Sequence, residues 1–204
     1  MAAAKRQHHR MTVAEFLDWG KDDPQRCELV HGEVFAIAPG SLIHQSLAGR
    51  LGRSIGNALA SRTFCAVLPD VGIALGNADD TFYEADLAVS CEPLTRGRYF
   101  LTDPVLVIEI LSPSTENHDR KNKVPDYRRI PSLREIVLVD QDRPYVEVLR
   151  RIDNDRWQSD ILQGLEAMLR LETVPLELRL ADLYRDIEFE EEFAKGQPVA
   201  AGGH

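Results

Sequence analysis

The sequence has few cysteines, no long apolar run and no excess of positive charge. Its three cysteines are odd in number and scattered over 204 residues, so we expect neither a disulfide framework nor a zinc site, and a reducing, cytoplasmic location. No apolar run reaches the length of about 18 residues that spans a bilayer, so no membrane helix is expected. The charged start of the chain is not followed by an apolar stretch, which argues against a secretory signal.

The charge of the chain is negative and unevenly distributed. A formal net charge of −9 disfavours a protein that coats nucleic acid without specificity. It is compatible with an enzyme that has a local basic groove, because basic residues gather within 120–134 while acidic residues gather within 186–192.

Two sequence motifs of large enzyme classes are also absent. No glycine-rich phosphate loop follows an expected strand, so a nucleotide-binding Rossmann or P-loop domain has no support. No Gly-x-Ser-x-Gly motif is present, which leaves a serine hydrolase of the nucleophile-elbow type without support.

The composition is that of one soluble globular domain with a real core. Hydrophobic residues make up 44% and charged residues 28% of the chain, and the length suits a single domain. We expect a flexible arm over residues 1–11, one domain over 12–184 and an acidic, disordered tail over 185–204.

The order of the expected elements indicates an α/β fold. Thr12 and Glu15 form a capping box that opens a helix, His31-Gly32 suits a hairpin turn, and a four-residue apolar spacing predicts a long amphipathic helix. We expect helices over 12–19, 42–61 and 119–129, strands over 26–30, 33–38, 63–75, 82–91, 103–111, 135–139, 145–151 and 157–162, and edge strands with a helical turn within 165–183. This order predicts a mixed central sheet flanked by helices, preceded by a helix and a hairpin.

One stretch of the sequence combines features typical of an active site. Residues 105–111 are apolar and rich in β-branched side chains, as in a strand covered on both faces, yet Glu109 lies among them. Burying a carboxylate is costly unless a partner, a proton or a metal compensates. Pro113 ends this strand, and a helix that we expect to be capped by Asp119 follows, with Pro125 tightening or kinking its first turns.

A second acid on the preceding strand suggests a metal site. If the two strands are neighbours, Asp86 and Glu109 approach each other, and two close carboxylates are usually held by a divalent cation or share a proton. Carboxylate oxygens suit Mg²⁺ or Mn²⁺. A nearby lysine would orient or deprotonate the attacking water, and Lys123 and Lys121 are the candidates.

The spacing alone leaves simpler roles open. Glu109 could pair with an arginine such as Arg120, and Asp86 could accept hydrogen bonds from turn amides. For His44, at the start of the long helix, a surface or capping role is favoured over a place in a cleft.

Other polar residues near these segments are expected to be structural. Ser112 and Ser114 suit a turn, Tyr127 suits packing, and the cysteines suit small core positions.

The segments that contain these residues resemble a known family. The resemblance rests on residues 27–34 (Cys-Glu-Leu-Val-His-Gly-Glu-Val), on His44-Gln45, on residues 86–89, and above all on residues 107–115 (Val-Ile-Glu-Ile-Leu-Ser-Pro-Ser-Thr) followed by Asp119-Arg120-x-x-Lys123-x-x-x-Tyr127. Together they resemble the Uma-two family of endonucleases, which have the restriction-endonuclease-like fold of the PD-(D/E)xK superfamily. The resemblance covers residues 12–184.

The resemblance implies roles for particular residues. Asp86 and Glu109 would bind Mg²⁺ or Mn²⁺, with the backbone carbonyl of Ile110 as a further ligand, and Lys123 would be the catalytic lysine. Secondary candidates are Glu33, His44, Glu84 and Lys121.

Two positions depart from the superfamily pattern. The lysine two residues after the acid is Leu111 here, so its role would pass to Lys123 on the following helix. The proline usually found before the aspartate is Ala85.

The resemblance implies a metal-dependent endonuclease that hydrolyses phosphodiester bonds in DNA. Two alternatives remain: a nuclease fold retained as a non-catalytic binding or regulatory module, and a hydrolase of a small phosphorylated molecule. The oligomeric state is open, although a homodimer would follow by analogy with nucleases that cut both strands.

Overall fold

The computed structural model describes residues 10–21, 25–76 and 78–189. The expected arm lies outside these residues except for its last two, and only residues 185–189 of the expected tail are described. No helix of the described part is long and apolar enough to cross a membrane.

A mixed sheet forms the centre of the fold, as expected. Its strand order is β2-β1-β4-β6-β7-β8-β9, and β3 pairs with β4 and with the short β5, which the sequence did not indicate. Among the strands that the structure describes, only β6–β7 and β3–β5 are parallel pairs. The strands are β1 (Cys27–Val30), β2 (Glu33–Ala36), β3 (Ala66–Ala74), β4 (Phe82–Ser90), β5 (Phe100–Leu101), β6 (Leu106–Leu111), β7 (Glu135–Asp140), β8 (Tyr145–Arg151) and β9 (Trp157–Gln163).

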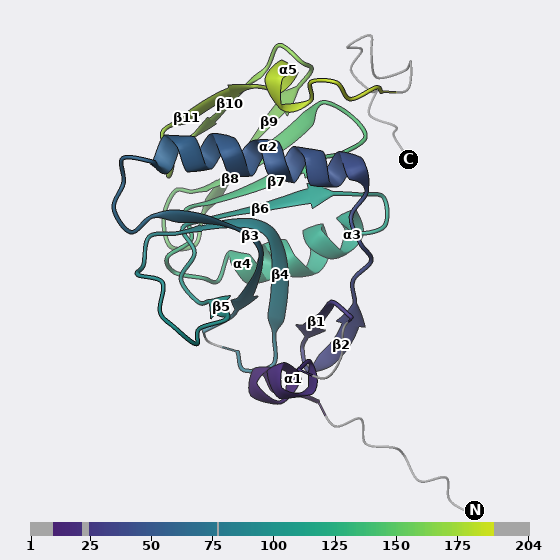
Figure 1. The fold of residues 1–204 in the computed structure, drawn as a ribbon, viewed down its shortest axis with the longest axis vertical. Coiled ribbons are helices and arrows are strands. Elements are labelled where there is room, and N and C mark those ends of the chain that lie inside the picture. Colours follow the sequence, from purple (N-terminus) through teal and green to yellow (C-terminus); the bar gives the residue numbers. More distant parts are fainter. Residues whose placement is uncertain (1–9, 22–24, 77, 190–204) are drawn as a thin grey trace, which may run out of the picture.

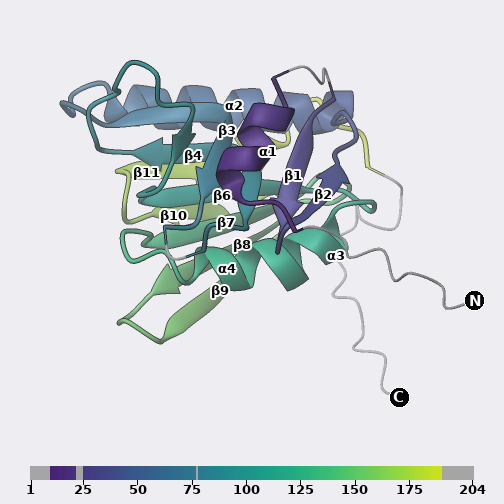
Figure 2. The same cartoon turned by 90° about the horizontal axis from the view of Figure 1, so that it is seen from below.

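Helices cover the two faces of this sheet (Figure 1, Figure 2). The long α2 (Leu42–Leu59) lies across one face and buries the apolar stripe that its four-residue spacing predicts. A small second sheet of β10 (Met168–Leu171) and β11 (Leu176–Arg179), with α5 (Leu180–Leu183), completes that core. The helical segment after β6 covers the other face.

The chain enters the fold as the sequence predicts. In α1 (Val13–Trp19), Thr12 and Glu15 make the reciprocal hydrogen bonds of a capping box. β1 and β2 form an antiparallel hairpin whose turn residues, His31 and Gly32, both have positive φ. Phe16 of α1 packs against Phe82 at the start of β4.

The helix after β6 differs from the expectation. It runs as α3 (Glu116–His118), a π-helical turn η1 (Asp119–Lys123) and α4 (Val124–Tyr127). The expected cap at Asp119 is therefore wrong, since Asp119 lies inside the helix, 3% exposed. The amide of Val124 donates to Asp119 O, five residues back. Pro125 has no N–H for the usual four-residue bond, and a wider turn at this point accommodates that loss.

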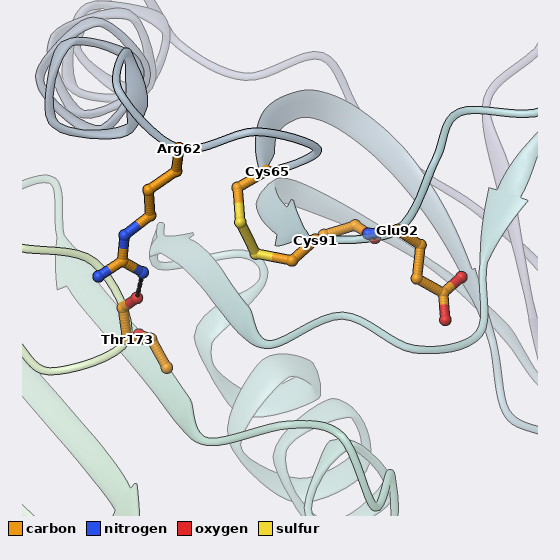
Figure 3. Close-up of a disulfide and its surroundings, with 6 residues drawn as sticks. Arg62, Cys65, Cys91, Glu92 and Thr173 are labelled. Carbon is orange, nitrogen blue, oxygen red and sulfur yellow. Dashed lines mark hydrogen bonds between the residues drawn. A yellow bond between two sulfur atoms is a disulfide. The ribbon is translucent and has the colours of Figure 1, made fainter.

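Two of the cysteines form a disulfide, contrary to the expectation of unpaired core cysteines (Figure 3). Ala66 pairs with Ser90 in the β3–β4 ladder, and Cys65 and Cys91 are the next residues along, bonded through their sulfurs. A single disulfide between neighbouring strands produces no recognisable cysteine spacing in the sequence. Only the register of β3 against β4 shows that these two cysteines are adjacent. Arg62, beside it in Figure 3, donates to the carbonyl of Thr173 at 2.8 Å. Cys27 is buried, as expected.

Candidate active site

The candidate site lies in a gap along one edge of β4. β3 pairs with β4 along its other edge. On the edge of the candidate site, β6 pairs with residues 87–89 of β4 and β1 pairs with Phe82, and the residues of β4 in between pair with neither of these two strands. Side chains replace the missing strand in between. Glu28 Oε1 accepts from the amide of Glu84 at 3.0 Å, and Lys123 Nζ donates to the Glu84 carbonyl at 2.9 Å. The gap thus collects charged side chains inside the fold.

Asp86 and Glu109 lie on the strands that flank this gap, which confirms that the two strands are neighbours. Leu87 pairs with Ile108, and continuing this register places Asp86 opposite Glu109. Asp86 Oδ2 accepts from the Ile110 amide at 2.7 Å. In an extended strand the N–H and the carbonyl of one residue point to the same edge, so the Ile110 carbonyl also faces the gap.

Glu109 is held by two donors rather than by an arginine. Its carboxylate is 2% exposed; Oε1 accepts from the Tyr127 hydroxyl at 2.7 Å, and Oε2 lies 3.4 Å from Lys123 Nζ. The alternative partner, Arg120, instead pairs with Glu116 and Glu147. Tyr127 is thus more than a packing residue. It lies four residues after Lys123 on the same helical segment, so both side chains can reach Glu109.

Lys123 is the centre of a buried charge cluster. Its ammonium lies 2.8 Å from Glu28 Oε1 and 3.5 Å from Asp119 Oδ1, in addition to its contact with Glu109. Glu28 also faces His118, whose Nε2 lies 2.9 Å from Glu28 Oε2. One lysine therefore serves three carboxylates that come from three separate segments of the chain.

Burial and crowding perturb the ionisation of this cluster. Burial raises the pKa of Glu109 well above its usual value, and repulsion from Asp86 and Asp119 adds to this effect although Lys123 opposes it. Burial likewise raises the pKa of Asp119. Burial alone would lower the pKa of Lys123, but the surrounding carboxylates raise it above its ordinary value. Lys123 is therefore a permanent cation at neutral pH.

His44 lies inside the site, contrary to the favoured surface or capping role. Ser41 caps α2 instead, accepting from the His44 amide. The imidazole is 13% exposed, with Nε2 3.2 Å from Asp86 Oδ2. Its other ring nitrogen, Nδ1, is buried and meets no hydrogen-bond partner within the described residues.

A pocket of about 300 Å³ opens onto these groups. Of the residues that the sequence suggested, it is lined by Glu84, Asp86, Glu109, Ile110, Lys123 and His44. Glu33 is exposed on β2 and Lys121 is exposed on η1, and neither lines the pocket. Ser112, Ser114 and Thr115 exchange hydroxyl hydrogen bonds in the turn after β6, as expected of turn residues.

The donor set fits a hard divalent cation. Four carboxylates and only two permanently cationic side chains, Arg26 and Lys123, line the pocket, so negative charge is in excess. The two carboxylates of Asp86 and Glu109 and the Ile110 carbonyl are oxygen ligands of the kind that Mg²⁺ accepts while keeping several waters. Within the described residues no three acidic, histidine or cysteine side chains form a cage. Backbone and water ligands would therefore complete the shell.

Four residues of this site were not singled out as candidates from the sequence. Glu28 and Asp119 hold Lys123, Tyr127 holds Glu109, and Arg26 pairs with Glu84 at the pocket mouth. Glu28, Asp119 and Tyr127 belong to the segments that carry the family resemblance, which was the available signal for them.

The chain is similar to a known family, to two relatives and to a solved structure. A family model described as "Uma2: Putative restriction endonuclease" matches residues 13–182. Two uncharacterized proteins of Synechocystis sp. are each 28% identical to the chain, one over 88% of it and 94% of the relative, the other over 77% and 90%. A crystal structure of "a putative nuclease belonging to DUF820" from Anabaena variabilis matches with a TM-score of 0.69 and 19% identity, over 85% of this chain and 97% of that one.

The structural match concerns the fold alone, a mixed α/β architecture that the chain shares with that protein. The family model covers most of the chain, including every residue of the pocket. The chain therefore belongs to the Uma2 family of restriction-endonuclease-like proteins.

Proposed function

We propose that the chain is a metal-dependent endonuclease that hydrolyses phosphodiester bonds in DNA. The observation that carries this proposal is the meeting of Lys123 and Glu109 at 3.4 Å, beside Asp86, in one open pocket. The family and the nuclease-like fold support the reaction class. The choice of metal and of DNA rests on the oxygen-rich donor set and on the resemblance in sequence.

Asp86, Glu109 and the carbonyl of Ile110 would hold Mg²⁺ or Mn²⁺. When bound, the metal would supply positive charge to the scissile phosphate and help to generate the nucleophile. Lys123 would donate to an anionic phosphate oxygen, where negative charge develops in the transition state. Because the carboxylates raise its pKa, Lys123 suits this electrostatic role better than that of a base.

Tyr127 and Glu28 would support these groups. The Tyr127 hydroxyl fixes one oxygen of Glu109, and Glu28 fixes the ammonium of Lys123 from the side away from the pocket, which Glu28 does not line. Such supporting contacts hold reacting groups in place before the substrate arrives.

The decisive experiment is cleavage of supercoiled plasmid and of single-stranded DNA with Mg²⁺ or Mn²⁺. Wild type should cleave, Glu109→Gln should not, and Glu33→Gln, which changes an exposed acid outside the pocket, should cleave like wild type. Cleavage by all three proteins would contradict the proposed site. Cleavage by none of them would contradict the proposed activity.

A second candidate function has one observation in its favour. Asp86 and Glu109 already have protein donors, namely the Ile110 amide, His44, Tyr127 and Lys123. These groups could therefore serve to close the gap in the sheet of a non-catalytic binding module. Calorimetry with Mg²⁺ and Mn²⁺ separates the two, because the module would bind neither ion at this position. The homodimer and the cytoplasmic location stay predictions.

A further inference from the structure

The candidate active site continues into a second hollow on the other side of Asp86. This hollow, of about 310 Å³, shares His44, Gln45 and Asp86 with the first pocket. It runs between α2 and β3, which lie side by side in both views (Figure 1, Figure 2). We call it the helix groove; its further lining residues are Ala48, Gly49, Gly52, Arg53, Val67, Pro69, Asp70 and Leu87.

One face of α2 forms one wall of the helix groove. Gln45, Gly49 and Arg53 are spaced four residues apart, so they lie on the same side of the helix, and all three are exposed. The core face of α2, with Leu47 and Leu51, points into the sheet. The three groove residues span roughly 12 Å along the helix axis, a length that about three or four phosphates of one strand cover in duplex geometry.

Gly49 keeps the middle of the helix groove open. A glycine inside a helix costs about 1 kcal/mol relative to alanine, and no packing need explains it here, because a Cβ at Gly49 would meet nothing within 4 Å. The missing side chain leaves the helix backbone accessible to a ligand that approaches closely.

The helix groove offers a phosphate one cationic side chain, Arg53, next to the acids Asp70 and Asp86. Within the described residues, the guanidinium of Arg53 meets no carboxylate at ion-pair distance, although it lies beside a site rich in acids. The acid across the groove, Asp70, is paired with Arg26 at 2.9 Å. Arg26 itself lines the first pocket. Cationic side chains therefore flank Asp86 on both sides.

We propose that the helix groove binds the phosphodiester backbone of a nucleic-acid strand next to the cleavage position. Arg53 donates to one phosphate, the Gln45 amide lies closer to the scissile phosphate, and Gly49 lets the strand approach α2 between them. This assignment rests on the proposed nuclease function and gives its substrate a polymer class, because a small diester would need the first pocket alone.

The test compares variants that block or uncharge the groove with matched controls. Arg53→Ala removes the cation and Gly49→Leu fills the open space. Gln163→Leu adds a leucine at an exposed position of β9 outside the groove, and Arg170→Ala removes an exposed arginine of β10. The primary readout is the Kd of a fluorescent single-stranded oligonucleotide for the intact chain in EDTA, by anisotropy at several salt concentrations.

Arg53→Ala and Gly49→Leu should each weaken binding by about tenfold, the value of one charged contact, while both controls bind like wild type. Arg53→Ala should also lower the slope of log K against log salt by about 0.7, as expected on losing one contact to a single strand. Equal Kd values for all variants, or no binding by wild type, would overturn the proposal.

Hydrolysis assays separate this proposal from the function on which it rests. With Mn²⁺, the two groove variants should raise the KM for an oligonucleotide and leave the hydrolysis of bis(4-nitrophenyl) phosphate, a small diester, within about twofold of wild type. Loss of both activities together would overturn the groove as a strand site. Groove-dependent binding without any hydrolysis would refute the endonuclease and keep the groove.

Discussion

The ammonium of Lys123 lies 2.8 Å from Glu28, closer than the 3.4 Å that separates it from Glu109. Glu28, a 2% exposed acid of β1, thus anchors the lysine from outside the pocket. From this anchor the lysine extends toward Glu109, which lines the pocket. Although burial opposes it, the hydrogen bond from His118 and the charge of Lys123 hold the pKa of Glu28 below its ordinary value. Glu28 is therefore a permanent counter-ion, which leaves Glu109 available to a metal.

Removing the ammonium of Lys123 should abolish cleavage without abolishing metal binding. We expect Lys123→Ala to lower kcat by about 100-fold or more, the usual cost of losing a transition-state donor. The exposed Lys121→Ala is the matched control and should keep full activity. Plasmid cleavage measures the activity of both variants, and Mn²⁺ titration measures their metal binding. Both are done at a temperature where circular dichroism shows the variants folded. Wild-type turnover by Lys123→Ala would remove the lysine from the mechanism.

Glu109→Gln should become relatively more stable than wild type as the pH rises. Burial raises the folded-state pKa of Glu109 above its ordinary value of 4.5, so above pH 4.5 the native state binds a proton that the unfolded state has lost. The free energy of unfolding then falls with rising pH until the folded-state pKa is reached. The amide that replaces the carboxyl group does not titrate, so the variant lacks this loss. Urea unfolding of both proteins at pH 5 and pH 8 measures this difference in the free energy of unfolding.

The same pair of proteins tests for the cation directly. Mg²⁺ or Mn²⁺ should raise the Tm of wild type, because a ligand at 100 times its Kd stabilises the native state by about 2.7 kcal/mol. Glu109→Gln should show a much smaller rise, and Glu33→Gln the full one. A sharp fall in the metal-free stability of Glu109→Gln at pH 7 would instead identify Glu109 as a structural member of the ion cluster.

The sequence predicts the parts of the fold that depend on local patterns. The capping box at Thr12, the turn at His31-Gly32 and the apolar spacing of α2 are local, and each is present. The register that places Asp86 beside Glu109 follows from strand alternation once the strands are neighbours. The position of Asp119 beside the ammonium of Lys123 depends on a π-helical turn. That turn has no local sequence pattern beyond Pro125.

Other features depend on contacts between distant segments, which no spacing encodes. The sequence favoured a surface or capping role for His44, whereas in the structure its imidazole turns toward Asp86 of β4. In the sequence, Glu28 cannot be distinguished from any other acid in a strand. Its role follows only from the pairing of β1 with β4, which brings it to the amide of Glu84. The bond between Cys65 and Cys91 follows only from the β3–β4 register.

The disulfide should contribute stability but no activity. Cys65 and Cys91 close a loop with a sequence separation of 26, and the chain-entropy relation gives about 3.5 kcal/mol for a loop of that length. We expect the double variant Cys65→Ser/Cys91→Ser to unfold at correspondingly lower urea concentration and to cleave DNA like wild type when folded. Dithiothreitol should destabilise wild type and leave the double variant unchanged.

A thiol count of the purified, unreduced protein provides the control for this prediction. Denatured wild type should react as one thiol per chain, from Cys27, and a count of three would contradict the bond. Equal stability of wild type and the double variant would show that the bridge constrains the unfolded chain less than the entropy relation assumes.

His44 should stabilise the fold in a pH-dependent way. The hydrogen bond to Asp86 raises the folded-state pKa of His44 above its ordinary value of 6.5, although burial opposes this. Its stabilising contribution is therefore complete below pH 6.5 and is lost as the pH rises through the higher folded-state value. His44→Gln should reduce the free energy of unfolding more at pH 6 than at pH 8.5. The control His31→Asn changes an exposed histidine outside the pocket, and asparagine tolerates the positive φ of that turn. A His44→Gln difference that is constant across this range would mean that Asp86 does not hold a charged imidazole.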